Sequence, residues 1–143
     1  MKKDLLSCMD LTRGDFERII SLSAELKDGR GKPDAPKPLL GKSIGMIFAK
    51  SSTRTRVSFE VGIYELGGHP LYLDQSRTQM GRGETVPDTA HVLERYLAGI
   101  VIRTFAQQDL IDLAANARIP IINALTDDFH PCQALTDLFT MYE

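Results

Sequence analysis

A buried strand that ends in a cluster of hydroxyls and cations is the feature that most constrains this chain. Residues 44–49 read IGMIFA, and residues 50–56 read KSSTRTR. Near-continuous apolarity over so short a run is typical of a strand covered on both faces, as in parallel sheets. Residues 57–66 read as a helix, so the polar segment lies between the end of a buried strand and the start of a helix.

The polar segment has the composition of an anion site. It carries three consecutive hydroxyls, a fourth two places later, and three cations. The first turn of a helix has free backbone N–H groups and lies at the positive end of the helix dipole. Hydroxyls donate further hydrogen bonds, and guanidinium groups match the oxygens of a phosphate. We therefore predict that residues 52–56 bind a phosphate; the alternative is an ordinary helix cap with solvated arginines.

Strand-like and helix-like segments alternate four times along the chain. The pattern predicts strands at 43–49, 69–73, 99–103 and 119–124, and helices at 57–66, 85–98, 107–118 and from Pro131 onward. A further helix precedes them, opened by Thr12 with Asp15 as a capping-box pair. This alternation predicts an α/β fold, a three-layer domain with a four-stranded parallel sheet flanked by helices.

Composition limits the class of protein. A length of 143 residues fits one domain, and 43% hydrophobic and 25% charged residues are ordinary values for a soluble globular protein. A net charge of −2 gives no indication of nucleic-acid or membrane binding over the whole surface. The N-terminus lacks the apolar core of a signal peptide, and the two cysteines form no metal or redox pattern. We therefore expect a cytoplasmic protein.

Polar candidates follow each of the four expected strands. Residues 52–56 follow the first strand, the loop 74–84 with Gln79 follows the second, Arg103 closes the third, and His130 and Gln133 follow the fourth. In parallel sheets, ligands bind beyond the carboxyl ends of the strands. We therefore expect these four pieces of chain to meet at one edge of the sheet.

Each candidate also has a purely structural interpretation. Arg103 alone would be a surface arginine at a strand end, but beside a phosphate turn it can polarise a substrate oxygen. His130 alone would be a structural histidine. With Pro131 fixing its backbone, it can donate to a carbonyl oxygen while Gln133 contacts an amide. For Gln79, the local sequence favours nothing beyond a polar loop residue.

The cysteines and the remaining histidines are expected to have no chemical role. Cys132 lacks a general base and a reason to form a thioester. Cys8 is interpreted as a packing residue. His69 and His91 are interpreted as structural or surface residues.

The two polar clusters resemble two signatures of one family. Residues 52–56 (STRTR), followed by VSFE, resemble the carbamoyl-phosphate signature of the aspartate and ornithine carbamoyltransferases. His130–Gln133 (HPCQ), with Leu135, Asp137 and Leu138 after it, is similar to the second signature. The resemblance extends from about residue 4 to the last residue.

The ornithine branch of that family fits better than the aspartate branch. Residues 79–84 (QMGRGE) are similar to the glutamine-bearing loop of the ornithine branch. The aspartate branch carries a substrate-binding lysine there, and no lysine occurs between Lys50 and Glu143.

The resemblance implies a role for each candidate residue. Arg103 and His130 would polarise the carbamoyl carbonyl group, and Gln133 would contact the carbamoyl nitrogen. Gln79 would reach the phosphate bound by a neighbouring subunit, because family members are built on trimers. Arg56 would brace the turn. The residues implied to hold the phosphate are Ser52, Thr53, Arg54 and Thr55.

The resemblance also implies a reaction. The δ-amine of L-ornithine attacks carbamoyl phosphate to give citrulline and phosphate, a step of arginine biosynthesis. No metal or organic cofactor is implied, and a homotrimer is expected.

One departure from the family affects the expected activity. Family chains are about twice as long, and their second domain binds the amino-acid substrate. We therefore expect residues 1–143 to form a carbamoyl-phosphate-binding domain without the ornithine-binding domain, with little or no turnover of ornithine alone. The alternatives are a domain of an aspartate-type or other carbamoyltransferase, and a non-catalytic anion-binding or oligomerisation module.

Overall fold

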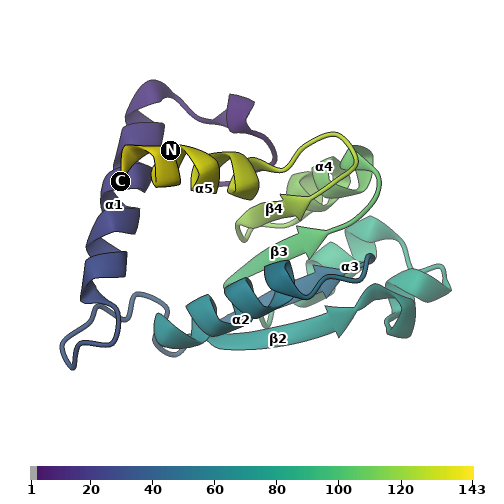
Figure 1. The fold of residues 1–143 in the computed structure, drawn as a ribbon. Helices are drawn as coiled ribbons and strands as arrows, with labels where there is room; N and C mark the ends of the chain where they lie inside the picture. The colour runs from purple at the N-terminus through teal and green to yellow at the C-terminus, as the bar shows by residue number, and fades with distance from the viewer. Residues whose placement is uncertain (1–2) are drawn as a thin grey trace.

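The computed structural model describes residues 3–143 (Figure 1). Its strands and helices are, in chain order, η1 (Cys8–Asp10), α1 (Arg13–Gly29), β1 (Ser43–Phe48), α2 (Arg54–Glu65), β2 (His69–Asp74), η2 (Gln75–Arg77), η3 (Gln79–Arg82), α3 (Val86–Leu93), β3 (Gly99–Arg103), α4 (Gln107–Asn116), β4 (Ile121–Leu125) and α5 (Pro131–Tyr142).

The four strands form one parallel sheet in the order β2-β1-β3-β4, which confirms the predicted α/β fold. The chain passes from β1 outward to β2 and then adds β3 and β4 on the other side of β1. The strand order thus reverses between β1 and β3, and open α/β sheets bind ligands at such a reversal. Phe48 and Arg103, the last residues of β1 and β3, are paired. The two strands therefore end side by side at this position.

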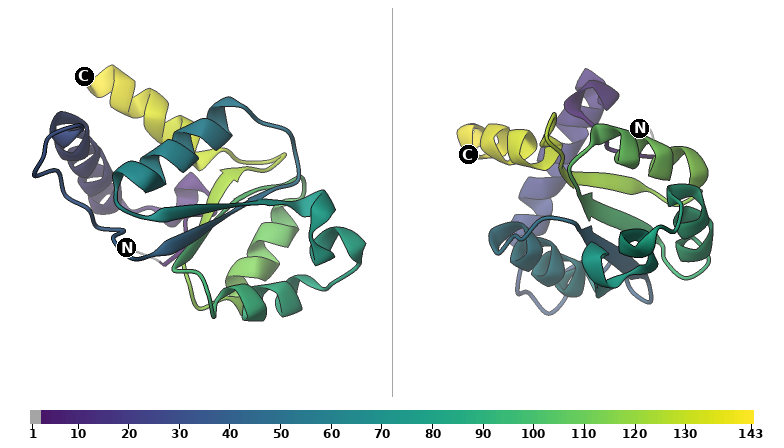
Figure 2. Two further views of the ribbon diagram at one scale, coloured as in Figure 1. Left: turned by 90° about the horizontal axis from the view of Figure 1, so that it is seen from below. Right: turned by 90° about the vertical axis from the view of Figure 1, so that its right-hand side faces the viewer.

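Helices cover both faces of the sheet, so the domain has three layers (Figure 2). Successive strand residues point to opposite faces and enter two separate cores. Ile47 and Ile102 pack in the core with residues of α3 and α4. Met46 and Phe48 pack on the other face with Ile63 of α2. This two-sided burial explains the near-continuous apolarity of the strands.

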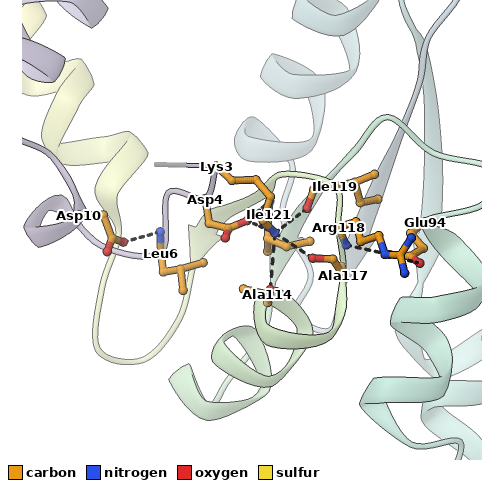
Figure 3. Close-up of polar contacts among 10 residues, drawn as sticks. All are labelled: Lys3, Asp4, Leu6, Asp10, Glu94, Ala114, Ala117, Arg118, Ile119 and Ile121. Atoms are coloured by element: carbon orange, nitrogen blue, oxygen red, sulfur yellow. Dashed lines mark hydrogen bonds and ion pairs between the residues drawn. The ribbon is translucent and has the colours of Figure 1, made fainter. Parts of the chain in front are cut away.

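The N-terminal segment lies along the outer edge of β4 (Figure 3). Leu5 forms a parallel bridge with Ile122. The carboxylate of Asp4 accepts a hydrogen bond from the N–H of Ile121 at 2.9 Å. Lys3 donates to carbonyl groups just beyond the end of α4. The segment thus occupies backbone groups that an edge strand would otherwise leave unpaired.

The first helix begins as predicted. Thr12 is the N-cap of α1, and its hydroxyl accepts from the N–H of Asp15 while the Asp15 carboxylate accepts from the N–H of Thr12. This reciprocal pair lowers the pKa of Asp15 through hydrogen bonds from Thr12. The predicted capping box is confirmed.

The helix predicted over residues 85–98 is shorter than expected. It ends at Leu93, after which the N–H groups of Arg95 and Tyr96 bond to carbonyls only three residues back. These tighter turns bring Leu97 into the core, where it is 5% exposed. The helical spacing of apolar residues continues to Leu97, but the α-helical backbone ends at Leu93.

Two other segments also differ from the prediction. The stretch 74–84 was expected to be a long exposed loop and contains the two 3-10 helices η2 and η3. β4 begins at Ile121 instead of Ile119, because Pro120 has no N–H to add to the sheet. The carbonyl of Pro120 still accepts from the N–H of Ile100 at 2.9 Å.

The last helix, α5, continues from β4 on the α2 side of the sheet and reaches α1 (Figures 1 and 2). Its predicted apolar face is only partly covered: Leu135 is buried, whereas Leu138 and Tyr142 are exposed. Within residues 3–143, no helix combines the length and apolarity needed to cross a lipid bilayer.

Candidate anion-binding site

A cavity of about 580 Å³ lies beyond the carboxyl ends of β1, β3 and β4, between the first turns of α2 and α5. Its walls are mainly polar and come from three separate parts of the chain. The lining residues are Ser51, Ser52, Thr53, Arg54, Thr55, Ser58, Phe59, Arg103, His130, Cys132, Gln133 and Thr136.

The cavity brings together all but one of the candidate residues. Those that line it are Ser52, Thr53, Arg54, Thr55, Arg103, His130 and Gln133. Gln79 lies elsewhere, in η3 beyond β2, where it lines a second, mostly apolar cavity with Met80 and Leu93. Three of the four strand-end segments thus meet as expected, and the Gln79 loop does not join them within one chain.

The start of α2 leaves its first-turn N–H groups available to a ligand. Thr53 is the N-cap residue, but its side chain makes no capping hydrogen bond. The hydroxyls of Thr12 and Thr85 do cap α1 and α3. An uncapped helix start that lines a polar cavity has the unsatisfied donors and the positive dipole end that favour an anion. This geometry disfavours the alternative interpretation of residues 52–56 as an ordinary helix cap.

Among the three cations at positions 50, 54 and 56, Arg54 alone lines the cavity. Within residues 3–143, Arg54 forms no ion pair. Its guanidinium is therefore available for a bound anion.

Arg56 has partners outside the cavity. Its guanidinium carbon lies 3.7 Å from the centre of the Tyr72 ring, and its Nε donates to Glu60 at 3.2 Å. Tyr72 belongs to β2 and Glu60 to α2, so Arg56 links the helix to the sheet. These contacts agree with the bracing role expected for Arg56.

Arg103 connects the third strand to the helix start. One of its terminal nitrogens donates to the Thr55 hydroxyl at 3.3 Å. Its Nε is buried and has no hydrogen-bond partner among the described residues. A buried donor without a partner is rare and calls for a functional or structural explanation. At the wall of a polar cavity, the guanidinium has spare donor capacity for an oxygen atom.

His130 is half-buried at the N-cap of α5, and Pro131 occupies the first helical position. Burial lowers the pKa of His130, the nearby Arg103 lowers it further, and Asp137 opposes them. The imidazole is therefore neutral at pH 7. Its Nδ1 accepts from the N–H of Gln133 at 3.4 Å. In a neutral ring this assigns the proton to Nε2, which can donate to an acceptor.

Gln133 and Cys132 follow His130 on α5. The side-chain amide of Gln133 donates to Asp137 at 2.8 Å. Cys132 donates its S–H to the carbonyl of Asn123 at 3.3 Å, and burial raises the pKa of its thiol to about 11. The thiol is therefore protonated at neutral pH, in agreement with the interpretation of Cys132 as an inert residue.

The sequence interpretation missed four residues of the cavity wall: Ser51, Ser58, Phe59 and Thr136. Ser58 lies four residues after Arg54, and Thr136 lies three residues after Gln133. Both spacings place a side chain on the same face of a helix as a candidate residue, so helical periodicity was the available signal.

The expectation for Cys8 was wrong. Cys8, expected to be a packing residue, is exposed. Residues 3–143 contain no group of three or more His, Cys, Asp or Glu side chains that could hold a metal ion.

Comparison with known proteins identifies the type of domain. Residues 3–143 match the family model described as "Aspartate/ornithine carbamoyltransferase, carbamoyl-P binding domain". The chain is 57% identical to the ornithine carbamoyltransferase of Syntrophus aciditrophicus over 143 residues, which are 100% of this chain and 47% of that protein. The chain thus spans about half the length of the curated relatives it matches.

Solved structures agree with the sequence comparison. The ornithine carbamoyltransferase from Pyrococcus furiosus superposes with a TM-score of 0.93 and 45% identity, over 98% of this chain and 45% of that one. The enzyme from Burkholderia thailandensis superposes with a TM-score of 0.92 and 43% identity, over 99% of this chain and 49% of that one. With the family match covering nearly every residue, this chain belongs to the aspartate/ornithine carbamoyltransferase family as its carbamoyl-P binding domain.

Proposed function

We propose that the cavity binds carbamoyl phosphate and that the chain serves as the carbamoyl-phosphate-binding half of an ornithine carbamoyltransferase. The observation that carries this proposal is the arrangement of the cavity wall. The uncapped helix start carries Arg54. Arg103 and a neutral His130 line the same cavity, and Arg103 also donates to Thr55 of that helix start. The first group suits a phosphate, and the second suits a carbonyl oxygen.

The phosphate is bound at the start of α2. Ser52, Thr53 and Thr55 supply hydroxyl donors, and Arg54 supplies a positive charge that forms no ion pair among residues 3–143. Charge-assisted hydrogen bonds of this kind are stronger than neutral ones and contribute about 2 kcal/mol each.

The carbamoyl oxygen is polarised by Arg103 and His130. Attack on the carbamoyl carbon places negative charge on this oxygen, and fixed donors stabilise that charge by about 3 kcal/mol each. The Nε2–H of a neutral His130 is such a donor, and the guanidinium of Arg103 is another. The amide oxygen of Gln133 accepts from the carbamoyl NH₂ group, because its amide nitrogen is already directed to Asp137.

The proposed reaction joins the δ-nitrogen of ornithine to the carbamoyl carbon. The neutral amine supplies the electron pair of the new C–N bond and loses one proton. The C–O bond between the carbamoyl carbon and the phosphate breaks. The phosphate leaves with the electron pair of that C–O bond and accepts the proton that the amine loses. Residues 52–55 stabilise the departing charge. No metal and no organic cofactor take part.

Ornithine is proposed as the acceptor on two grounds. The relatives and solved structures with the similarities given above are named ornithine carbamoyltransferases. The loop 79–84 also lacks the lysine of the aspartate branch. The substrate and the activity belong to the longer protein, because the relatives have about twice the length of this chain.

A homotrimer in the cytoplasm is the proposed setting. Gln79 lies outside the cavity of its own chain and is exposed. These observations agree with a role at the phosphate of a neighbouring subunit. Sedimentation equilibrium measures the assembly directly: the expected mass is three times that of the chain, and a purely monomeric species would contradict the proposed contact of Gln79.

Isothermal titration calorimetry with phosphate and with carbamoyl phosphate tests the proposed ligand. Arg54→Ala is expected to weaken binding by about tenfold or more, since it removes a charge-assisted hydrogen bond. Arg18→Ala is the matched control, because Arg18 is an exposed arginine on α1 outside the cavity wall. Unchanged affinity in Arg54→Ala, or equal losses in both variants, would show that the cavity is not the binding site.

A further inference from the structure

Lys50 lies two residues before Ser52, the first of the proposed phosphate-binding residues, but does not line the cavity. Its ammonium group forms an ion pair and hydrogen bond with Asp127 and lies over the ring of Phe105, 4.4 Å from the ring centre. The Lys50 side chain is only 20% exposed, whereas that of Asp127 is 63% exposed. A mostly buried ammonium group that contacts both an aromatic ring and a carboxylate is more restricted in position than the ammonium group of an ordinary surface lysine.

The three side chains come from three different strand ends. Lys50 follows β1, Phe105 follows β3, and Asp127 follows β4. These strands carry the residues of the proposed site: Lys50 precedes Ser52, Phe105 lies two positions after Arg103, and Asp127 lies three positions before His130. We call Lys50, Phe105 and Asp127 the strand-end cluster.

The segment that joins Asp127 to His130 is short and internally bonded. The N–H of Thr126 donates to the carbonyl of Phe129 at 3.0 Å, and the N–H of Phe129 donates to the Thr126 hydroxyl at 3.1 Å. The N–H of Asp127 donates to the carbonyl of Phe105 at 2.9 Å. These bonds fix the backbone of the short turn between Asp127 and His130 and attach it to the residue that follows β3.

We propose that Lys50 is a positioning residue, which sets the distance between the phosphate-binding turn and His130 through the strand-end cluster. This inference rests on the proposed function, because it assumes that both sides of the cavity hold one ligand. A ligand that spans two walls loses affinity when the walls are free to move apart. The cluster fastens the three strand ends together outside the cavity.

Three variants separate the parts of the cluster. Lys50→Met removes the ion pair and the ring contact but keeps an unbranched side chain. Asp127→Asn removes the ion pair alone. Lys50→Arg keeps a cation that can both pair with Asp127 and stack on Phe105.

The chain offers a matched control. Lys27 also pairs with a carboxylate, Glu143, and lies over an aromatic ring, Phe139, at 5.6 Å. This second cluster joins α1 to the end of α5 and does not line the cavity. Lys27→Met therefore removes the same kinds of contact, including one positive charge, away from the proposed site.

Calorimetry with carbamoyl phosphate and melting curves are measured for all variants. Lys50→Met and Asp127→Asn are each expected to weaken binding by about fivefold or more, and the double variant should lose less than the product of the two. Lys50→Arg should bind nearly as well as wild type. Lys27→Met should bind carbamoyl phosphate with the affinity of wild type, even if its melting temperature falls as far as that of Lys50→Met.

The sign of the Asp127→Asn effect distinguishes positioning from simple charge effects. If only Coulomb forces acted, removing the negative charge of Asp127 would strengthen anion binding, because it removes a repulsion. Tighter binding in Asp127→Asn would show that Asp127 competes with the ligand for Lys50 and would overturn the inference. Normal binding in Lys50→Met would also overturn it.

NMR titration of His130 gives a readout that overall stability does not affect. Burial lowers the pKa of His130 most, the charge of Arg103 lowers it further, and the charge of Asp137 raises it. If the cluster holds His130 in place, Lys50→Met should bring the His130 pKa back toward its ordinary value. An unchanged pKa would count against the inference.

Failure of this inference is distinguishable from failure of the proposed function. If Arg54→Ala loses binding while the two cluster variants keep it, the ligand site stands and the positioning role is wrong. If Arg54→Ala keeps binding, the proposed function itself fails.

Discussion

His130 is under opposing electrostatic influences, and their balance determines its protonation state. Burial and the positive charge of Arg103 favour the neutral ring, and Asp137 favours the charged one. The neutral form prevails and keeps one N–H for donation. A protonated ring would add positive charge beside Arg103 and would lose its acceptor at Nδ1, which now receives the N–H of Gln133.

We predict that the His130 pKa lies below its ordinary value in the free chain and responds to its two neighbours in opposite directions. Arg103→Gln should raise it and Asp137→Asn should lower it further. Because folding lowers this pKa, the unfolded chain binds the proton more tightly. Above the His130 pKa of the unfolded chain, this residue therefore does not reduce the free energy of unfolding. As the pH falls from the unfolded-state pKa to the folded-state pKa, the free energy of unfolding decreases. A proton NMR titration of the ring measures both shifts, and equal pKa values in all three proteins would contradict the assignment.

Cys132 shows that a thiol in a cavity wall need not be reactive. Thiolates are the nucleophilic form, and a pKa of about 11 leaves almost no thiolate at neutral pH. We predict that iodoacetamide at pH 7.5 modifies the exposed Cys8 much faster than Cys132. Peptide mass spectrometry after timed quenching gives both rates, and rapid labelling of Cys132 would contradict its buried, protonated state.

At the scale of elements, β4 connects the edge of the sheet to the His130 segment. Asn123 is fully buried in β4, and its amide nitrogen donates to the carbonyls of Leu6 at 2.8 Å and Phe129 at 3.3 Å. One residue thus fastens both the N-terminal segment and the turn before His130. Gln107 of α4 joins the same network through Thr126.

We predict that Asn123→Ala lowers the free energy of unfolding by about 2 kcal/mol, since it empties a fully buried site and removes hydrogen bonds to two part-buried carbonyls. Asn116→Ala is the matched control. It removes a single bond to the Asp112 carbonyl within α4 and should cost less than about 1 kcal/mol. Urea denaturation compares the two variants, and an equal loss in both would show that the Asn123 network is not special.

The elements that could be predicted from sequence are those with local causes. The Thr12–Asp15 cap, the Gly99–Arg103 strand and the start of α5 at Pro131 follow from signals within a few residues. The early end of α3 could not be predicted this way, because Leu97 continues the helical spacing while packing into the core from a tight turn.

At the scale of the whole molecule, the order of the strands determines where the site forms. Alternating strands and helices predicted parallel strands, but the sequence does not reveal which strand lies beside which. The neighbouring positions of β1 and β3 bring Arg103 to Thr55. The contacts of Lys50 with Asp127 and Phe105 were likewise invisible in the sequence, whereas the bracing role of Arg56 was expected from the resemblance.

We predict that the 143 residues alone bind carbamoyl phosphate and form almost no citrulline, because the matched family model is the carbamoyl-P domain alone. When the chain is extended with the remaining half of a relative, citrulline formation should appear with ornithine and not with aspartate. A colorimetric citrulline assay distinguishes these cases. Turnover by the 143 residues at the rate of the extended chain would contradict the predicted inactivity of the chain alone, and a preference for aspartate would contradict the proposed acceptor.

We propose that one cavity, formed by the start of α2 and the segments around Arg103 and His130, binds carbamoyl phosphate. A titration of the ¹⁵N-labelled chain with carbamoyl phosphate, followed by two-dimensional NMR, locates the bound ligand directly. We expect saturable shifts that are largest for the backbone amides of Arg54 and Thr55, accompanied by shifts at Arg103 and Gln133. Shifts centred on another surface, or none at saturating ligand, would contradict it.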